Sequence, residues 1–335
     1  NNLVGLTRIF AEARGKLLGF GFCVFTEPDG YKDGRVTMTF DPTGMLTLTM
    51  TAQDNGQGHW TTFAQVVADR LGVPVEKVRV VQGDTDRVGF GLGTGGSRVA
   101  TVAGSAIYHG ALEIVEKGKR IAAQMLEADT ADIEFAAGRF TIAGTDRSVD
   151  ILAVAKAAFD VAKVPAPQGL GLEASYHYAA RAYSYSSGCH VAEVEIDRET
   201  GHIRLARYLL VGDYGTVINP MLLEGQLHGG IAQGASQILW EDCRYDPDSG
   251  QLLTGSFMDY CLPRAADMPD FVMGWNHTPC LTNPLGIKGV GESGTTAAMP
   301  AVMNAVIDAL APYGASEIEM PVTAEKVWRI LSARG

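Results

Sequence analysis

One glutamate sits in a setting that suits chemistry. Glu292 lies in the run Gly289-Val290-Gly291-Glu292-Ser293-Gly294, where glycines remove side-chain bulk on both sides of a single carboxylate. A metal or cofactor could approach such a group closely, and the alternative interpretation is a solvated glutamate on a surface turn. The apolar residues Ile287 and Val290 and the apolar stretch from Met299 favour a buried neighbourhood. Burial raises the pKa of a carboxyl group towards the range useful for a general base.

Two glycine-rich loops precede helical patterns and are candidates for binding an anion. In the first, Asn55-Gly56-Gln57-Gly58, glycines would let backbone N–H groups approach a phosphate or an amide, although a plain tight turn is commoner. The second ends in Thr94-Gly95-Gly96-Ser97-Arg98 and offers backbone donors, two hydroxyls and a guanidinium before a helix, which suits a pyrophosphate. It lacks the Lys-Ser/Thr ending of a P-loop, which disfavours nucleotide hydrolysis.

The remaining polar side chains give weaker indications. Gln57, Gln226 and Gln233 can donate and accept hydrogen bonds around a polar ligand, but surface glutamines are commoner. The histidines form no HxxxH or HExxH pair, and Cys189-His190 lies on a predicted strand whose successive side chains face opposite ways, so we interpret both as structural. Serines within 184–187, near His190, raise a hydrolase as an alternative, but no GxSxG elbow accompanies them.

Composition indicates a folded protein with two lobes. The 335 residues exceed a typical single domain, and 46% hydrophobic with 19% charged residues leave little room for disorder. A net charge of -11 without runs of Lys or Arg argues against nucleic-acid binding. Apolar stretches are interrupted well before the roughly 20 residues that span a bilayer. The five cysteines form no CxxC pair, and we interpret them as buried thiols in a reducing compartment, the cytoplasm.

Sequence patterns place these loops between strands and helices. Residues 35–51 alternate as a β-hairpin whose second strand leads into the first glycine loop, and a helix with one apolar side follows as far as Gly72. A strand at 78–81 precedes the second loop, and a long Ala-rich helix covers 99–127. The Pro- and Gly-rich segment 163–172 is the best linker candidate, which divides the chain into lobes 1–165 and 166–335.

The second lobe continues the pattern of hairpins and helices. We expect strands at 189–196 and 202–211, a helix at 220–239 that begins at Asn219-Pro220, a second hairpin around 246–250 and a helix at 299–310. The predicted fold class is therefore α+β, with helices packed on sheets built mostly from hairpins.

Taken together, these segments resemble the xanthine oxidase family, most closely its carbon-monoxide-dehydrogenase-like branch of molybdenum hydroxylases. The resemblance rests on DNGQGHWTTFAQVVADRLGVPVEKVRVVQGDT, GTGGSRVATVAGSA, HVAEVEIDRETGHIRL, GDYGTVINPMLLEGQLHGGIAQG, GSFMDYCLPRA and NPLGIKGVGESGTTAAMPAVMNAVIDAL. These motifs span nearly the whole chain in the order of the family. The resemblance implies the two-lobed molybdenum-cofactor-binding fold and the C-terminal part of the large molybdopterin-binding subunit.

The resemblance also implies a cofactor and a set of residues around it. Molybdenum would be held by the dithiolene of a molybdopterin, in its cytosine dinucleotide form, and no side chain of the protein would ligate the metal. The implied cofactor-binding residues are Gly56, Gln57, Gly58, Thr94, Gly95, Gly96, Ser97, Arg98 and Gln233. Glu292, in the GVGE motif, would be the general base of a hydroxylation in which water supplies the oxygen.

The implied enzyme needs further parts. Electrons would pass to 2Fe-2S and FAD centres on partner subunits, and an N-terminal molybdenum-binding lobe or subunit would complete the site before Asn1. The implied substrate is a small molecule, either an N-heterocycle or an aldehyde. Two alternatives stay open: a carbon monoxide dehydrogenase, whose chemistry depends on a copper-binding cysteine loop absent from these residues, and a cofactor-binding or assembly module without turnover.

Overall fold

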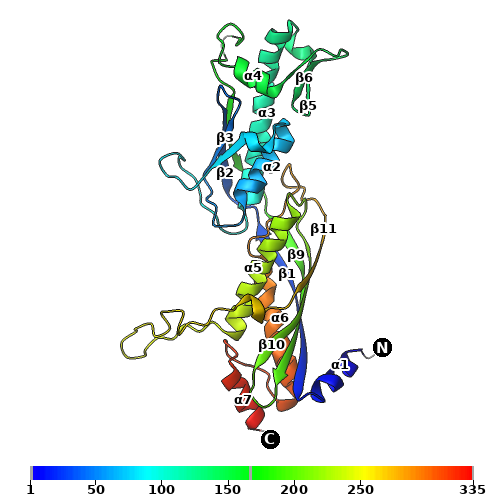
Figure 1. The fold of residues 1–335 in the computed structure, drawn as a ribbon, viewed down its shortest axis with the longest axis vertical. Coiled ribbons are helices and arrows are strands. Elements are labelled where there is room, and N and C mark those ends of the chain that lie inside the picture. The colour runs from blue at the N-terminus through cyan, green and yellow to red at the C-terminus, as the bar shows by residue number, and fades with distance from the viewer. Residues whose placement is uncertain (1–2, 166–167, 334–335) are drawn as a thin grey trace.

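The protein consists of two lobes stacked along one long axis (Figure 1). Its structure, a computed structural model, describes residues 3–165 and 168–333. Each lobe has a hydrophobic core of its own. The first core comprises residues between Val36 and Ala174, and the second combines Leu17 with residues between Ala192 and Leu331. The predicted α+β, two-lobed fold is confirmed.

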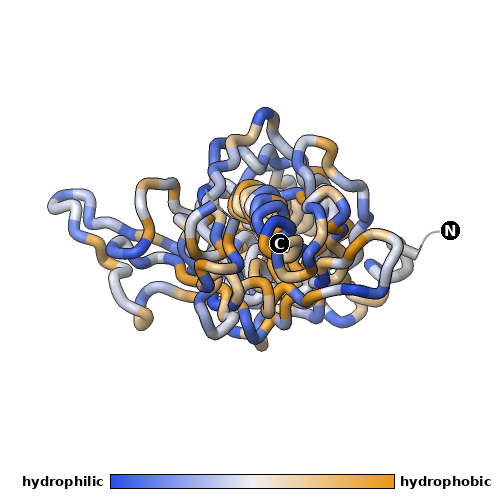
Figure 2. The backbone as a smooth tube through the Cα atoms, turned by 90° about the horizontal axis from the view of Figure 1, so that it is seen from above, coloured by the Kyte–Doolittle hydropathy of each residue, from blue (hydrophilic) through white to orange (hydrophobic). Residues whose placement is uncertain are grey.

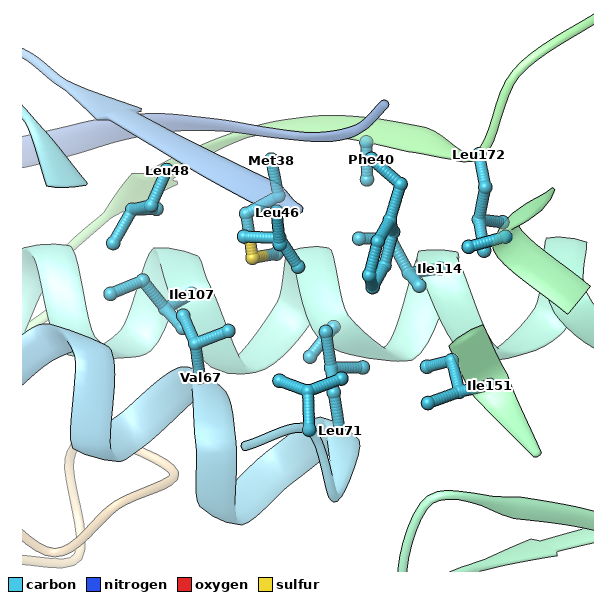
Figure 3. Close-up of a cluster of buried hydrophobic side chains, with 14 of the residues drawn as sticks. Met38, Phe40, Leu46, Leu48, Val67, Leu71, Ile107, Ile114, Ile151 and Leu172 are labelled. Atoms are coloured by element: carbon cyan, nitrogen blue, oxygen red, sulfur yellow. The ribbon is translucent and has the colours of Figure 1, made fainter. Parts of the chain in front are cut away.

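The first lobe is a four-stranded sheet with two helices on its apolar face. In the order β4-β3-β2-β8, its strands are Val78–Val81, Leu46–Met50, Asp33–Phe40 and Glu173–Ala179. Buried Val36, Met38 and Phe40 alternate with less buried residues along β2, which makes one face apolar. The helices α2 (His59–Leu71) and α3 (Val99–Leu126) cover this face (Figure 3). Each large side chain buried here contributes roughly 1.5–3 kcal/mol.

A smaller sheet extends the first lobe. It contains β5 (Ile133–Ala136), β6 (Arg139–Ile142) and β7 (Ser148–Asp150), and α4 (Ile151–Ala157) follows directly. Gly118 of α3 lets the Phe140 ring approach the helix, since a Cβ at this position would lie 2.4 Å from the ring. The small sheet is therefore anchored to the same long helix that covers the larger one.

The second lobe is built on a second four-stranded sheet. In the order β1-β9-β10-β11, its strands are Lys16–Asp29, Ser184–Asp197, Ile203–Asp213 and Phe271–Asn276. The helix α6 (Ser293–Leu310) lies along β1 and β9, and α5 (Pro220–Leu239) packs against α6. Glycines allow α6 to contact β1 closely: a Cβ on Gly21 would lie 2.1 Å from the carbonyl oxygen of Ala301.

The other face of this second sheet carries exposed apolar side chains. Phe22, Val24 and Val272 are 66%, 70% and 62% exposed. They point away from α6 because successive side chains of a strand alternate between the two faces. Within the described residues, the second sheet thus has one covered and one uncovered face.

The chain order interleaves the two lobes. β1 comes before the whole first lobe, yet it pairs with β9. β8 comes after the predicted division at residues 165 and 166, yet it pairs with β2. The first lobe is therefore inserted between β1 and β9. The domain ranges 1–165 and 166–335 stay a prediction. The predicted linker, 163–172, includes residues 166–167, which lie outside the described residues.

Most predicted elements are present, and two differ. The helix predicted from Met299 begins earlier, at Ser293, directly after Glu292. The hairpin predicted around 246–250 is reduced to one bridge between Tyr245 and Leu252. An isolated two-stranded hairpin is only marginally stable, and Tyr245 is 61% exposed, so no core supports longer strands here.

This bridge lies in a projecting segment, residues 241–264. The segment leaves the body on the side away from α1 (Leu3–Glu12), and polar and apolar residues are mixed along it (Figures 1 and 2). Cys243 and Cys261 are exposed there, so the prediction of buried thiols is wrong for both, because the segment packs against no core. The last helix, α7 (Ala324–Ser332), closes the second lobe. No helix within 3–165 and 168–333 combines the length and apolarity needed to cross a membrane.

Candidate functional site

A pocket of about 490 Å³ is lined by residues of both lobes. Four helices begin at it: α2 at His59, α3 at Val99, α5 directly after Asn219 and α6 directly after Glu292, and all four residues line the pocket. The first N–H groups of a helix have no partner within the helix, and its N-terminus carries a partial positive charge. Their convergence suits a ligand with anionic groups.

Two glycine-rich loops form one wall of this pocket, and Gln53 ties them together. The Gln53 Oε1 accepts a hydrogen bond from the Thr94 backbone at 2.8 Å, and its carbonyl accepts one from the Thr94 hydroxyl at 2.5 Å. Gly56 has a φ of +105°, a conformation that favours glycine. A side chain at Gly56 or Gly95 would meet open space, so the backbone of both loops is accessible to a ligand.

A neutral histidine supports the first loop. His59 is 7% exposed, and burial lowers its pKa to about 4, although the negative charge of Asp54 acts to raise this pKa. Its Nδ1 lies 3.4 Å from the Gln57 Nε2 and 3.3 Å from the Gln82 Nε2, so the uncharged ring nitrogen can accept from these amides. This cluster orients Gln57 at the pocket wall without adding a charge.

The loop that carries Glu292 packs directly against the second glycine loop. A Cβ on Gly289 would lie 2.0 Å from the Ser97 carbonyl oxygen, so glycine is required for this contact. The Gln226 Nε2 donates to the Gly291 carbonyl at 3.1 Å and holds the loop from α5. Glu292 itself is exposed at the pocket wall. The prediction of a buried neighbourhood is therefore wrong for this residue, because the adjacent glycines provide no side chains to cover it.

Ser97 brings a second carboxyl group to Glu292. Its φ of +50° is uncommon for a residue other than glycine. In this conformation its hydroxyl contacts the Glu292 carboxylate and lies 2.5 Å from the Glu27 Oε1, and it accepts from the Glu292 N–H at 2.9 Å. Burial and the nearby Glu292 raise the pKa of Glu27, against hydrogen bonds from Ser97 and Ser293. Glu27 was not predicted, because no motif surrounds it on β1.

Arg98 is engaged by the protein itself. Its side chain is buried, with 4% of the residue exposed, and its guanidinium donates to the carbonyls of Asp33, at 2.8 Å, and Gly93. Burial lowers the pKa of Arg98, although the nearby Asp33 opposes this shift. The side chain thus fixes the second loop to β2. A contact between this guanidinium and a pyrophosphate stays a prediction.

The opposite wall contributes a phenol and an ion pair. The Tyr214 hydroxyl is buried and has no hydrogen-bond partner among the described residues. Burial raises the pKa of Tyr214, so the hydroxyl stays protonated, and it packs against Gly212, where a Cβ would lie 2.4 Å from its oxygen. Lys288 binds Asp213 with an Nζ–Oδ2 distance of 2.8 Å. Although burial opposes it, this contact lowers the pKa of Asp213.

The pocket gathers most of the predicted site. Its lining includes Gly56, Gln57, Thr94, Gly95, Gly96, Ser97, Arg98 and Glu292. Gly58 and Gln233 are not in this lining: Gly58 turns the chain into α2 with a φ of +79°, and the exposed Gln233 accepts from the Thr295 hydroxyl at 3.2 Å. Their contacts with a cofactor stay predictions. Sequence reasoning missed His59 and Tyr214, and no spacing rule marks either residue.

The serines on β9 belong to this hydrogen-bond network. The Ser186 hydroxyl lies 3.0 Å from that of Ser293 at the start of α6. The nearby His190 is bonded instead to the Tyr208 hydroxyl at 2.6 Å, and burial lowers the pKa of His190 to about 4. No Ser–His hydrogen bond occurs in the described part of the chain, so the hydrolase alternative loses its geometric basis. The same residues hold no cluster of three or more His, Cys, Asp or Glu side chains suited to a metal.

Comparison with known proteins defines the class to which this fold and pocket correspond. The family profile described as "Molybdopterin cofactor-binding domain" matches residues 5–269, which include the two glycine loops and most of the second lobe. The fold around the pocket is therefore that of a molybdopterin cofactor-binding domain.

Individual relatives narrow this class. The chain is 37% identical over 328 residues to the carbon monoxide dehydrogenase large chain of Hydrogenophaga pseudoflava, a match covering 94% of this chain and 40% of the relative. It is 39% identical over 334 residues to the nicotine 6-hydroxylase large subunit of Paenarthrobacter nicotinovorans, covering 95% and 41%. The structure of quinoline 2-oxidoreductase from Pseudomonas putida 86 matches with a TM-score of 0.89 and 37% identity, over 98% of this chain and 44% of that one.

The chain belongs to the molybdopterin-binding domains of xanthine oxidase family large subunits, and the resemblance seen in its motifs is confirmed. It spans about 40% of the length of the curated relatives it matches.

The residues of the pocket fit a molybdopterin cofactor. Four helix N-termini and the exposed backbone of two glycine loops suit its phosphates. The Gln57 Oε1 accepts from the Asn55 N–H at 2.5 Å and has a second acceptor position, which suits an N–H on the polar edge of a pterin. The volume of about 490 Å³ lies within the usual range of small-molecule and cofactor sites.

Proposed function

We propose that this chain is the C-terminal part of the large subunit of a molybdenum hydroxylase, which inserts oxygen from water at a carbon atom of an N-heterocycle or an aldehyde. The observation that carries the proposal is the position of Glu292, whose exposed carboxylate lines the pocket at which four helices begin. Two relatives named for a nicotine 6-hydroxylase and a quinoline 2-oxidoreductase support the N-heterocycle class.

Each part of the pocket has a separate task in this proposal. When bound, the molybdenum cofactor supplies a Lewis acid that accepts two electrons. The glycine loops and the helix N-termini hold its phosphates, and Gln57 orients its pterin. Glu292 accepts the proton that leaves the attacking oxygen. The hydrogen bond from Gln226 to the Gly291 carbonyl keeps the Glu292 backbone in place while it does so.

We also propose partners for the chain. An N-terminal molybdenum-binding lobe completes the substrate side of the pocket, and iron-sulfur and FAD subunits carry the electrons away. The first part is supported by the length of the relatives, of which this chain matches about 40%. The cytosine dinucleotide form of the cofactor and a cytoplasmic location belong to the same proposal.

Glu292→Gln tests the proposed base. In the complete enzyme, this variant should lower kcat by roughly 10²- to 10⁴-fold, because positioned general bases contribute on that order. Molybdenum content should not change, since Glu292 is not needed to hold the cofactor. Glu224→Gln, an exposed residue on α5 outside the pocket lining, is the matched control and should keep wild-type turnover. Normal turnover of Glu292→Gln with a full complement of molybdenum would refute the assignment.

A second candidate reaction is the oxidation of carbon monoxide, which is favoured by the 37% identity to a carbon monoxide dehydrogenase large chain. Assays of the purified, molybdenum-loaded complex with quinoline, nicotine, an aromatic aldehyde and carbon monoxide separate the two. Turnover of a heterocycle or the aldehyde supports the hydroxylase, and turnover of carbon monoxide alone supports the second candidate. No turnover of any reducing substrate by a complete complex would favour a cofactor-binding module.

A further inference from the structure

The Ser97 hydroxyl contacts two glutamates, and it has too few protons to donate a hydrogen bond to each of them. The Ser97 hydroxyl has a single proton, yet its oxygen contacts the Glu292 carboxylate and lies 2.5 Å from the Glu27 Oε1. An ionised carboxylate only accepts hydrogen bonds, whereas a protonated one also donates. With both carboxylates ionised, one of these two contacts would have no proton in it. One proton on the carboxyl pair supplies the missing donor, because a single O–H shared between two carboxylates would leave each contact with a weaker, bifurcated bond.

The surroundings decide which carboxyl group holds this proton. Glu292 is exposed, while Glu27 is partly buried between β1, β9 and the start of α6. Burial disfavours the charged form of a carboxyl group, and so does a second carboxylate nearby. Both effects raise the pKa of Glu27. Neither glutamate forms an ion pair with a Lys or Arg in the part of the chain that the structure describes.

With the proton on Glu27, each contact on the path from Ser293 through Glu27 and Ser97 to Glu292 has a donor and an acceptor. The Ser186 hydroxyl lies 3.0 Å from Ser293 and 3.4 Å from the Glu27 Oε2, and it donates to the nearer of the two. Ser293 donates to the Glu27 Oε2 at 2.9 Å. The protonated Oε1 then donates to Ser97, and Ser97 donates to Glu292. The Glu292 N–H fills the second acceptor position of Ser97 at 2.9 Å. The hydrogen bonds thus run in one direction and end on the Glu292 carboxylate.

We propose that Glu27 is a positioning residue for Glu292: through the Ser97 hydroxyl it holds the single proton of the pair and keeps Glu292 ionised and ready to accept a proton. This inference rests on the proposed function, because it gives Glu292 the role of base. When Glu27 loses its proton at high pH, the two carboxylates compete for the one Ser97 hydroxyl, and Glu292 loses its fixed position.

Other charged and titratable groups around Glu27 are engaged elsewhere. They are Asp29 on the same strand, Arg98 beside Ser97, Lys288 in the loop before α6 and Tyr214 after β10. Asp29 accepts from the Ser184 hydroxyl and the Ser186 N–H, Lys288 binds Asp213, and Arg98 donates to backbone carbonyls. Tyr214 stays protonated because burial raises its pKa. Burial also raises the pKa of Asp29, so the comparison of wild type with Glu27→Gln is what assigns an alkaline limb to the Glu27–Glu292 pair.

Two variants at one position separate this role from a purely structural one. In Glu27→Gln the amide can still donate to Ser97 but cannot titrate, whereas Glu27→Met removes the donor. In the complete enzyme, the pH profile of kcat/KM should lose its alkaline limb in Glu27→Gln. Glu27→Met should reduce kcat/KM by roughly tenfold more than Glu27→Gln does, since it removes a hydrogen bond to a charged chain. A Glu27→Gln profile that superimposes on that of the wild type would overturn the proposal.

A second readout does not depend on turnover. Infrared difference spectra between wild type and Glu27→Gln at neutral pH should show the carbonyl band of a protonated carboxylic acid, which should vanish as the pH rises through the alkaline limb. Absence of this band would mean that Glu27 is ionised, and the proposal would fall even if Glu292→Gln is inactive. An active Glu292→Gln with the band present would instead refute the proposed base and leave the shared proton intact. Should Glu27→Gln not fold, Glu27→Met replaces it in the difference spectra, and a missing carbonyl band there would count against Glu27.

Discussion

Gly21 provides a sharp test of how β1 packs against α6. Gly21→Ala adds a Cβ that would lie 2.1 Å from the Ala301 carbonyl oxygen and 2.2 Å from the Ala305 nitrogen. Both are backbone atoms, so the helix has to move away as a unit. Adding a methyl group to a packed core costs about 1–3 kcal/mol, and we expect the upper part of that range here. A loss of about 2–3 kcal/mol makes local opening roughly 30- to 140-fold more frequent.

Hydrogen–deuterium exchange of the full-length subunit measures this opening peptide by peptide. In Gly21→Ala, peptides from β1 and α6 should exchange faster by that factor, while α2 and β2 in the first lobe keep their rates. Gly225→Ala is the matched control, because the added methyl group meets open space on α5. Alanine is favoured over glycine in a helix by about 1 kcal/mol, so exchange there should slow or stay the same. Unchanged exchange of β1 in Gly21→Ala would refute the close approach of strand and helix.

Two further predictions concern a buried arginine and two buried histidines. Arg98→Met leaves the carbonyls of Asp33 and Gly93 without their donor, which costs about 1–3 kcal/mol. Limited proteolysis should therefore cut the second glycine loop faster in this variant than in the wild type. Equal rates of cleavage would contradict the role of Arg98. Because burial lowers the pKa of His59 and His190 from 6.5 to about 4, the unfolded chain binds more protons between these values, and stability should fall as the pH drops from 6.5 to 4. Urea unfolding midpoints at pH 7 and pH 4.5 measure this loss of stability, and the difference between them should be smaller in His190→Gln than in the wild type. An equal difference would show that His190 does not contribute to the loss.

Local patterns were sufficient to predict much of the first lobe. The alternation of Val36, Met38 and Phe40 places β2, and Gly72 ends α2 with a φ of +63°, as its position after the apolar helix predicts. The partners of β1 could not be predicted in this way. Its pairing with β9 joins residues such as Asp29 and Ser184, which are 155 residues apart in the sequence, and no local pattern records such a distance.

The same distinction holds for the site. The two glycine-rich loops and the loop that carries Glu292 could be predicted, because consecutive residues encode each of them. The contacts that join the loops to each other and to β1 could not be predicted, because they depend on backbone geometry: Ser97 turns its hydroxyl to Glu27 and Glu292 from a left-handed conformation. Arg98 looks like an anion ligand in the sequence, but the carbonyls that it binds become its neighbours only after folding. Glu292 is exposed for a similar reason, since its flanking glycines do not cover it.

The insertion of the first lobe between β1 and β9 affects how the chain folds during synthesis. Because Ser184 follows Asp29 by 155 positions, β1 waits roughly 8 to 30 s for its partner at a translation rate of about 5–20 residues per second. The first lobe is complete before β9 is made, and it pairs its own first and last strands, with Asp33 opposite Ala179.

This pairing brings the two ends of the inserted lobe side by side. The long loop that separates β1 from β9 is thereby reduced to the few residues on either side of a folded body, and the entropic cost of closing it falls accordingly. The first lobe thus acts as a template that holds the two strands of the second sheet in register. Glu27 and Ser186, which lie opposite each other on these strands, are aligned in the same step.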